Sequence, residues 1–258
     1  MSPTPTLIFI HGAWHSAECW LDVVSDVEKH GYRCLTPQLV FCGTAEPVNS
    51  LASSVSQIQT LIAQETGNGN DVVLINHSFG GSVGCSSVKG FSQKDPSKLT
   101  PNSGKVIGII QLCAFMPPSN TSLYDMIDPS DTFHHSSPDG WEVIDKRNPE
   151  DLFYNDLDQE SAQLWKGRLL KHSTATLKDR ESIYAGWADV PVSYIFAARD
   201  QAIPIQIQEA MVAAARGAGA SITTRTLDSG HSPFLSKIDE TVSSILEDVE
   251  TFKLGSAH

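Results

Sequence analysis

Short apolar runs alternate with amphipathic stretches along most of this chain, and this alternation limits the fold more than any other feature. Runs rich in Val, Ile and Leu lie at 6–12, 31–39, 71–77, 105–115, 192–198 and 221–227. Runs of this length and composition are typical of β-strands. The run KVIGIIQLCAF (105–115) is almost entirely apolar, as expected for a strand that is covered on both faces.

Stretches with helical spacing separate these predicted strands. Apolar residues recur every three or four positions in three of them: Trp20, Val23, Val24 and Val27; Leu51, Val55, Ile58, Leu61 and Ile62; and Ile238, Val242, Ile245, Val249 and Phe252. A further helix is expected around 204–216. Strands that alternate with helices predict βαβ units. We therefore expect the α/β class, with a mostly parallel, doubly wound sheet and helices on both faces.

The alternation is interrupted between residues 116 and 186. The stretch begins with MPPSN and continues without a clear period, with aromatic residues among polar ones. We expect 1–115 and 187–258 to form one core, and 116–186 to form a cap inserted over the sheet. A chain of 258 residues is long enough to bury a sizeable core.

Composition and charge narrow the class of partner. The formal net charge is −12, and no long basic cluster offsets it. Such a chain would be repelled by nucleic acid and by anionic membranes, so we expect neither as a partner and a small neutral or apolar molecule as the substrate. The N-terminal apolar run is too short for a signal peptide or a membrane span, which favours a cytoplasmic location. Oligomeric state cannot be read from the sequence.

The cysteines and histidines do not predict a metal site. The five cysteines are scattered and lack the spacing of a zinc site, so we expect small buried residues in a reducing compartment. The adjacent histidines of FHH (133–135) have no third ligand nearby in the sequence. We therefore expect neither a metal nor a cofactor.

The stretch VVLINHSFGGSVG (72–84) has the layout of a nucleophile elbow, in which a strand turns sharply into a helix with a serine at the apex. Ser78 stands at the apex. The pattern GxSxG requires glycine two residues earlier, where this chain has Asn76. We expect the Asn76 amide to hydrogen-bond a neighbouring loop and so to help hold the elbow.

A serine nucleophile needs a base and a group that orients the base. Asp200 and His231 also follow predicted strands, and the carboxyl ends of parallel strands meet at one edge of a sheet. The order Ser, Asp, His along the chain fits this fold. Each residue has a simpler alternative: Ser78 and Asp200 as helix caps, and His231 as a surface-loop residue. Asp228 is a rival acid, although it lies only three residues before His231.

The sequence resembles the α/β-hydrolase family along almost its whole length. NHSFGG is similar to the elbow, AARDQAIP to the acid segment and LDSGHSPF to the histidine loop. FIHGAWHSAECW (9–20) is similar to the stretch that supplies an oxyanion-hole amide in the plant methylesterase and hydroxynitrile lyase branch. With YNDLDQESAQLW, these stretches resemble a group of small capped hydrolases of fungi and bacteria.

This resemblance implies a role for each candidate. Ser78 would be the nucleophile, His231 the general base and then acid, and Asp200 the residue that orients His231. The backbone N–H groups of Ala13 and Phe79 would form the oxyanion hole. Several residues, mostly aromatic, are candidates to line the substrate pocket, and packing is the alternative for each of them: Trp14, His15, Trp141, Tyr154 and Trp187. His11 and His77 are expected to pack and hydrogen-bond beneath the pocket.

Three functions fit this reading. The first is a serine hydrolase that cleaves a carboxylic ester or lactone through an acyl-enzyme. The second is a carbon–carbon lyase on the same triad, although hydroxynitrile lyases of the similar branch carry Lys and Thr where this chain has Ser232 and Gly12. The third is a ligand-binding receptor on a hydrolase scaffold.

Overall fold

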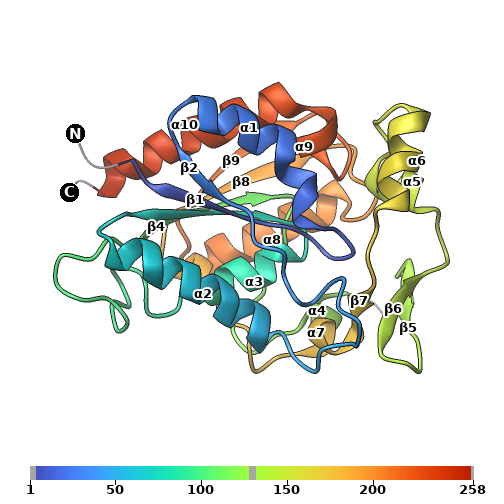
Figure 1. Cartoon of the computed structure of the whole chain (residues 1–258), viewed down its shortest axis with the longest axis horizontal. Helices are drawn as coiled ribbons and strands as arrows, with labels where there is room; N and C mark the ends of the chain where they lie inside the picture. Colours follow the sequence, from blue (N-terminus) through green and yellow to red (C-terminus); the bar gives the residue numbers. More distant parts are fainter. Residues whose placement is uncertain (1–3, 128–131, 257–258) are drawn as a thin grey trace.

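A six-stranded parallel sheet forms the centre of the structure, a computed structural model that describes residues 4–127 and 132–256 (Figure 1). The strand order is β2-β1-β3-β4-β8-β9. The bounds are β1 Thr6–Ile10, β2 Arg33–Leu35, β3 Val72–His77, β4 Val106–Leu112, β8 Val192–Ala197 and β9 Ile222–Leu227. The α/β-hydrolase fold predicted from the sequence is confirmed, and each strand corresponds to one predicted run.

Alternating residues of the strands face the two sides of the sheet. In β1, Leu7 and Phe9 pack in one hydrophobic cluster, while Ile8 and Ile10 pack in the other. All four side chains are fully buried. Since both faces need apolar cover, the strands read as continuous apolar runs in the sequence.

Helices cover both faces of this sheet (Figure 1). On one face lie α1 (Leu21–Lys29), preceded by the 3-10 helix η1 (Ala17–Trp20), together with α9 (Pro233–Ser236) and α10 (Ile238–Ser256). On the other face lie α2 (Ala52–Gly67), α3 (Gly80–Ser87) and α8 (Ile205–Gly217). The apolar stripes predicted for α1, α2 and α10 supply buried side chains to these two clusters.

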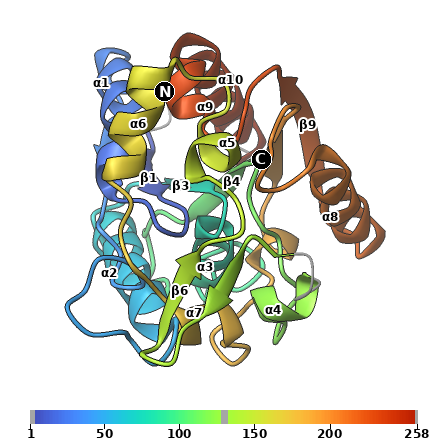
Figure 2. The same ribbon diagram turned by 90° about the vertical axis from the view of Figure 1, so that its right-hand side faces the viewer.

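The connection between β4 and β8 contains several short elements rather than irregular chain. They are α4 (Leu123–Met126), β5 (His134–Ser136), β6 (Trp141–Ile144), α5 (Pro149–Phe153), α6 (Gln159–Gly167), β7 (His172–Ser173), α7 (Thr174–Lys178) and the 3-10 helix η2 (Gly186–Ala188). Strands β5, β6 and β7 form a small antiparallel sheet. Figure 2 shows α4, α5, α6 and β6 in front of one end of the large sheet.

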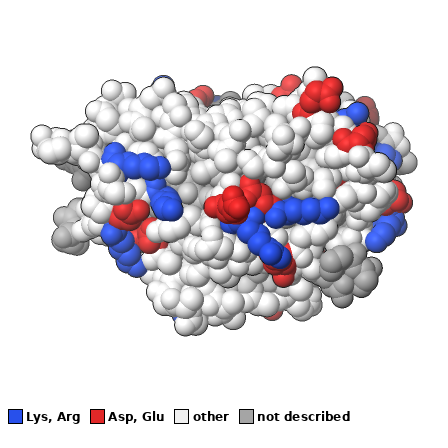
Figure 3. Space-filling view, turned by 90° about the horizontal axis from the view of Figure 1, so that it is seen from below, with Lys and Arg blue, Asp and Glu red and all other residues white. Residues whose placement is uncertain are grey.

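Charged side chains of both signs lie close together on the surface. On the face shown in Figure 3, Lys and Arg lie beside Asp and Glu, with wide uncharged areas between the groups. Within the described ranges, no helix is both long and apolar enough to cross a membrane.

Candidate active site

Ser78 lies at a sharp turn between β3 and α3, as the elbow pattern predicts. Its φ angle is +52°, in the left-handed region that non-glycine residues rarely adopt. Such strain is concentrated at functional sites, where the surrounding structure maintains it. Gly80 allows the close crossing behind the turn, because a Cβ atom there would lie 2.6 Å from the carbonyl oxygens of Ile10 and His11. The elbow therefore places Ser78 directly after the last residue of β3.

His231 and Asp200 form a buried pair at the same end of the sheet. The Nδ1 atom of His231 lies 2.7 Å from Oδ2 of Asp200. The other oxygen, Oδ1, accepts hydrogen bonds from the backbone N–H groups of Ala202 and Ile203, both at 2.8 Å. Asp200 therefore stabilises the turn after β8 and also fixes the imidazole. A carboxylate acceptor requires the proton on Nδ1, which leaves Nε2 of His231 able to accept one.

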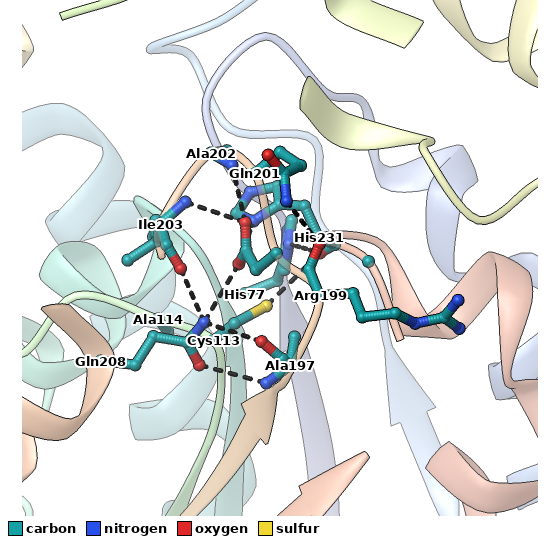
Figure 4. Close-up of polar contacts among 12 residues, drawn as sticks. His77, Cys113, Ala114, Ala197, Arg199, Gln201, Ala202, Ile203, Gln208 and His231 are labelled. Carbon is teal, nitrogen blue, oxygen red and sulfur yellow. Dashed lines mark hydrogen bonds and ion pairs between the residues drawn. The ribbon is translucent and has the colours of Figure 1, made fainter. Parts of the chain in front are cut away.

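Three further side chains hold this pair in place (Figure 4). His77 donates from Nε2 to the carbonyl oxygen of His231 at 2.8 Å, and the thiol of Cys113 donates to the same oxygen at 3.4 Å. Burial, and then the neighbouring His231, hold the pKa of His77 well below its usual value, so His77 is neutral. Gln208, on α8, donates from Nε2 to Oδ2 of Asp200 at 3.3 Å.

A cavity of about 520 Å³ brings the candidate residues together. Ser78, His231, Phe79 and Ala13 all line it. Among the described residues, neither the Ala13 nor the Phe79 backbone N–H donates a hydrogen bond, so both remain free for an oxyanion. No hydrogen bond joins Ser78 Oγ to His231 in the described structure. Such bonds often form only when substrate is bound.

The residues expected to line a substrate pocket separate into two groups. Trp14 lines the cavity and donates from Nε1 to the carbonyl oxygen of Glu142 at 3.2 Å. The lining does not include His15, Trp141, Tyr154 or Trp187, which are buried. The structure therefore favours the packing alternative for these four.

Three of these buried residues hold the structure around the cavity. The hydroxyl of Tyr154 lies 2.9 Å from Nε2 of His15, and Nδ1 of His15 lies 2.8 Å from the Ala13 carbonyl oxygen. Burial lowers the pKa of His15 to about 3, so this imidazole is neutral. Trp187 donates from Nε1 to the carbonyl oxygen of Pro117 at 2.8 Å. These contacts fix the backbone of the cavity without reaching into it.

The rival acid does not approach the imidazole. Asp228 pairs with Arg199 at 2.8 Å, and its side chain is 80% exposed. Of the two carboxylates, Asp200 is therefore the one within hydrogen-bond distance of His231.

His11 lies beneath the cavity as expected: Nδ1 lies 3.0 Å from the Gly12 carbonyl oxygen, and Nε2 accepts from the Leu39 N–H at 3.1 Å.

The prediction that the Asn76 amide hydrogen-bonds a neighbouring loop is wrong. Both polar atoms of the Asn76 amide are enclosed and have no hydrogen-bond partner in the described residues. The amide instead packs against α3, where a Cβ atom on Gly84 would lie 2.0 Å from its Oδ1. Asn76 thus fills space that the missing side chain of Gly84 leaves open.

Part of the resemblance in YNDLDQESAQLW has a structural explanation. Asp156 accepts a hydrogen bond from the Gly230 N–H at 2.6 Å, and Asn155 donates to the Arg199 carbonyl oxygen at 3.0 Å. The β4–β8 connection is therefore tied to the loops that carry Asp200 and His231.

Sequence reasoning missed several residues of the site. Gln208 lies in the helix expected around 204–216, where the sequence pattern gives no indication of a contact with Asp200. Phe153 is one of the aromatic residues of 116–186, and it lines the cavity. His134, one of the two adjacent histidines, lines the cavity. In the described ranges, one group of metal-ligating atoms lies close together, from His77, Cys113 and His231. These atoms belong to the network around the His231–Asp200 pair, and the expectation of no metal stays a prediction.

Known proteins with similar sequences and structures include several that are hydrolases or esterases by name. Residues 7–243 match the model of the alpha/beta hydrolase family. Alpha/beta hydrolase nvfD of Aspergillus novofumigatus is 28% identical over 246 residues, which cover 93% of this chain and 95% of nvfD. A pyrethroid hydrolase from Sphingobium faniae JZ-2 has a similar structure, with a TM-score of 0.76, 19% identity and coverage of 95% and 97%. The methylesterase MES16 from Arabidopsis has a TM-score of 0.69 and 20% identity, with 96% and 99% covered.

Proposed function

The chain belongs to the alpha/beta hydrolase family, and on that premise we propose that it is a serine hydrolase that cleaves a carboxylic ester or lactone of a small, largely apolar substrate. One observation carries the proposal. Ser78, at a strained elbow, shares a cavity with His231, whose Nδ1 is bonded to a buried carboxylate. The esterase and hydrolase names of the similar structures support the same class of reaction.

The acylation step follows from this arrangement. His231 Nε2 takes the proton of Ser78 Oγ as the oxygen attacks the substrate carbonyl carbon, and the carbonyl electron pair moves onto its oxygen. The free N–H groups of Ala13 and Phe79 line the cavity beside Ser78, where they can donate to this oxyanion. The Asp200 carboxylate stabilises the imidazolium that forms. The imidazolium then protonates the leaving oxygen, and an acyl-enzyme remains.

Deacylation uses the same groups, with water in place of Ser78 Oγ as the nucleophile. His231 Nε2 takes a proton from water, and the resulting hydroxide oxygen attacks the acyl carbon. A second oxyanion forms in the same position. When it collapses, Ser78 Oγ recovers its proton from the imidazolium and the carboxylic acid is released. Each proton passes through His231, and water is the second reactant that the balanced reaction needs.

The apolar lining of the cavity supports the proposed class of substrate. Most of the wall consists of apolar side chains, among them Phe115, Leu123, Phe133, Phe153 and Ile203. Pockets of this kind bind the apolar body of a ligand, while a few polar groups fix its orientation. The volume of about 520 Å³ suits a small molecule.

A fluorophosphonate probe tests the proposal directly, because it reacts with an activated serine. We expect labelling of the wild type and none of Ser78→Ala. We also expect Ser78→Ala to lower turnover of a p-nitrophenyl ester by about 10⁴-fold or more. Ser82→Ala is the control, since Ser82 lies one helical turn further along. A folded wild type that the probe does not label would overturn the proposal and favour a binding role for the cavity.

A further inference from the structure

A second histidine, His134, stands on the wall of the same cavity. It lies on β5, in the β4–β8 connection, and its side chain is only 4% exposed. The other titratable lining residues apart from His231 are Lys146 and Arg147, which are exposed. Within the described lining, His134 is thus the buried titratable group that the proposed mechanism does not use.

A buried carboxylate fixes the orientation of His134. Nδ1 of His134 lies 2.8 Å from Oε2 of Glu142, whose side chain is fully buried. The other oxygen of Glu142 accepts hydrogen bonds from Ser136 at 2.7 Å and Tyr124 at 3.0 Å. Burial alone would raise the pKa of Glu142, but the hydrogen bonds from His134 and Ser136 outweigh it and lower the pKa to about 2. Glu142 is therefore a carboxylate, and Nδ1 of His134 carries a proton.

The remaining nitrogen of His134 is left for a ligand. Nε2 makes no hydrogen bond with any residue that the structure describes. Nε2 is not fully enclosed by those residues, and the His134 side chain lines the cavity. A ligand in the cavity can therefore reach Nε2. The side chains around the ring are aromatic, with centroids of Trp14 and Phe133 at 5.2 and 5.1 Å. When an apolar ligand fills the cavity and displaces water, an unpaired Nε2 would cost free energy, which a polar group on the ligand would recover.

His134–Glu142 repeats the arrangement of His231–Asp200. In each pair a buried carboxylate accepts from Nδ1, at 2.8 and 2.7 Å, and the imidazole lines the common cavity. In its neutral form such an imidazole accepts a hydrogen bond at Nε2. The Glu142 carboxylate behind the ring disfavours a second anion there. A hydroxyl group, which is neutral and can donate, fits this position.

We propose that His134 is a specificity-determining residue, and that its Nε2 accepts a hydrogen bond from a hydroxyl group on the substrate, away from the scissile carbonyl. This inference rests on the proposed function, because it assumes that the ester or lactone lies at Ser78. It deepens that function by naming the substrate class: hydroxylated esters or lactones with an otherwise apolar body.

The test uses p-nitrophenyl esters of phenylacetic, phenylpropanoic and phenylbutanoic acids, so that different reaches from Ser78 are sampled. Each ring carries a hydroxymethyl, an ethyl or a carboxyl group at the para position. Hydroxymethyl and ethyl have nearly the same shape, and their ratio of kcat/KM isolates the hydrogen bond. For at least one chain length we expect wild type to prefer hydroxymethyl by about tenfold.

His134→Phe and His134→Leu replace the imidazole with apolar groups of different shape. In both we expect the ratio to fall to one or below, whatever happens to each rate separately. A merely structural role would lower both rates and leave the ratio unchanged. The matched control is His135→Phe: His135 also pairs with a carboxylate, Asp145 at 3.1 Å, but its side chain is 48% exposed and lies outside the lining. This control should keep the wild-type ratio.

Three outcomes would overturn the proposal: no hydroxymethyl preference at any chain length, a preference that survives in folded His134 variants, or a carboxyl preference that is lost with His134. Binding of the same esters to Ser78→Ala by calorimetry separates this proposal from the proposed function. A hydroxymethyl preference in Kd that depends on His134 would support the site even if Ser78 were not the nucleophile. Labelling of Ser78 without such a preference would leave only the hydrolase proposal standing.

Discussion

The contact between Asn76 and Gly84 makes a quantitative prediction about how the elbow is built. An ideal Cβ atom on Gly84 would lie 2.0 Å from Oδ1 of Asn76 and 2.4 Å from its Cγ and Nδ2. Ordinary contacts of a Cβ atom begin at 3.4 Å, so the clash with Oδ1 is about 1.4 Å. Both residues are buried, Asn76 on β3 and Gly84 on α3. We therefore expect Gly84→Ala to lower the free energy of unfolding by about 3 kcal/mol, at the upper end of the range for overpacking.

The amide of Asn76 makes the prediction a coupled one. Asn76→Ala removes side-chain contacts, but it also removes two enclosed polar atoms that have no described partner. These effects oppose each other, and we expect a net change within about 1 kcal/mol. In the Asn76→Ala background the added methyl group has space, so Gly84→Ala should then cost less than about 1 kcal/mol. The coupling energy between the two sites is therefore expected to be about 2 kcal/mol.

Urea unfolding of the wild type, both single variants and the double variant measures this coupling, with tryptophan fluorescence as the probe. Gly217→Ala is the matched control, because Gly217 also lies in a helix but has nothing within 4 Å of an added Cβ atom. It should be neutral or slightly stabilising. Additivity of the two changes to within about 0.5 kcal/mol would refute the reasoning, since it would mean that the side chains do not compete for one space.

Two further predictions concern the two buried carboxylates. Asp200→Asn should lower kcat by about 10³- to 10⁴-fold, because an amide N–H facing His231 favours the tautomer that cannot take a proton at Nε2; Asp228→Asn, at an exposed surface pair, should change kcat less than twofold. Since the folded pKa of Glu142 is about 2, below its ordinary 4.5, the unfolded chain binds more protons between these values and stability falls as pH falls. Glu142→Gln should lose less stability than wild type over this window in thermal unfolding at stepped pH. Equal losses of stability in wild type and variant would contradict a lowered pKa of Glu142 in the folded state.

The sequence predicted the core well for a physical reason. Strands covered on both faces must be apolar throughout, so β3, β4 and β8 stand out as continuous runs. Edge strand β2 is shorter than the predicted 31–39, since only Arg33–Leu35 pair with β1. β2 has a neighbouring strand on one side only, and its side chains are partly exposed. An edge strand of this kind needs fewer apolar residues than a central strand.

The site was predictable only where it follows the sheet. Ser78, Asp200 and His231 lie within four residues of the ends of β3, β8 and β9, so their meeting at one edge follows from parallel pairing. The pocket wall follows no such rule. Trp141 and Tyr154 are aromatic, as many pocket residues are. Whether such a ring faces a cavity or the core depends on the register of the short elements in the β4–β8 connection. The pairing of His134 with Glu142 depends on that register as well.

The two histidine–carboxylate pairs therefore have separate structural origins, and this separates the reaction from the choice of substrate. His231 and Asp200 come from loops at the end of the large sheet, which any chain with this strand order must bring together. His134 and Glu142 come from β5 and β6, in a small sheet of the connection. Substitutions in that small sheet can move or remove the second pair while Ser78, His231 and the free N–H groups stay in place. Specificity for a hydroxyl group can thus be gained or lost in the connection without any change in the chemistry at the elbow.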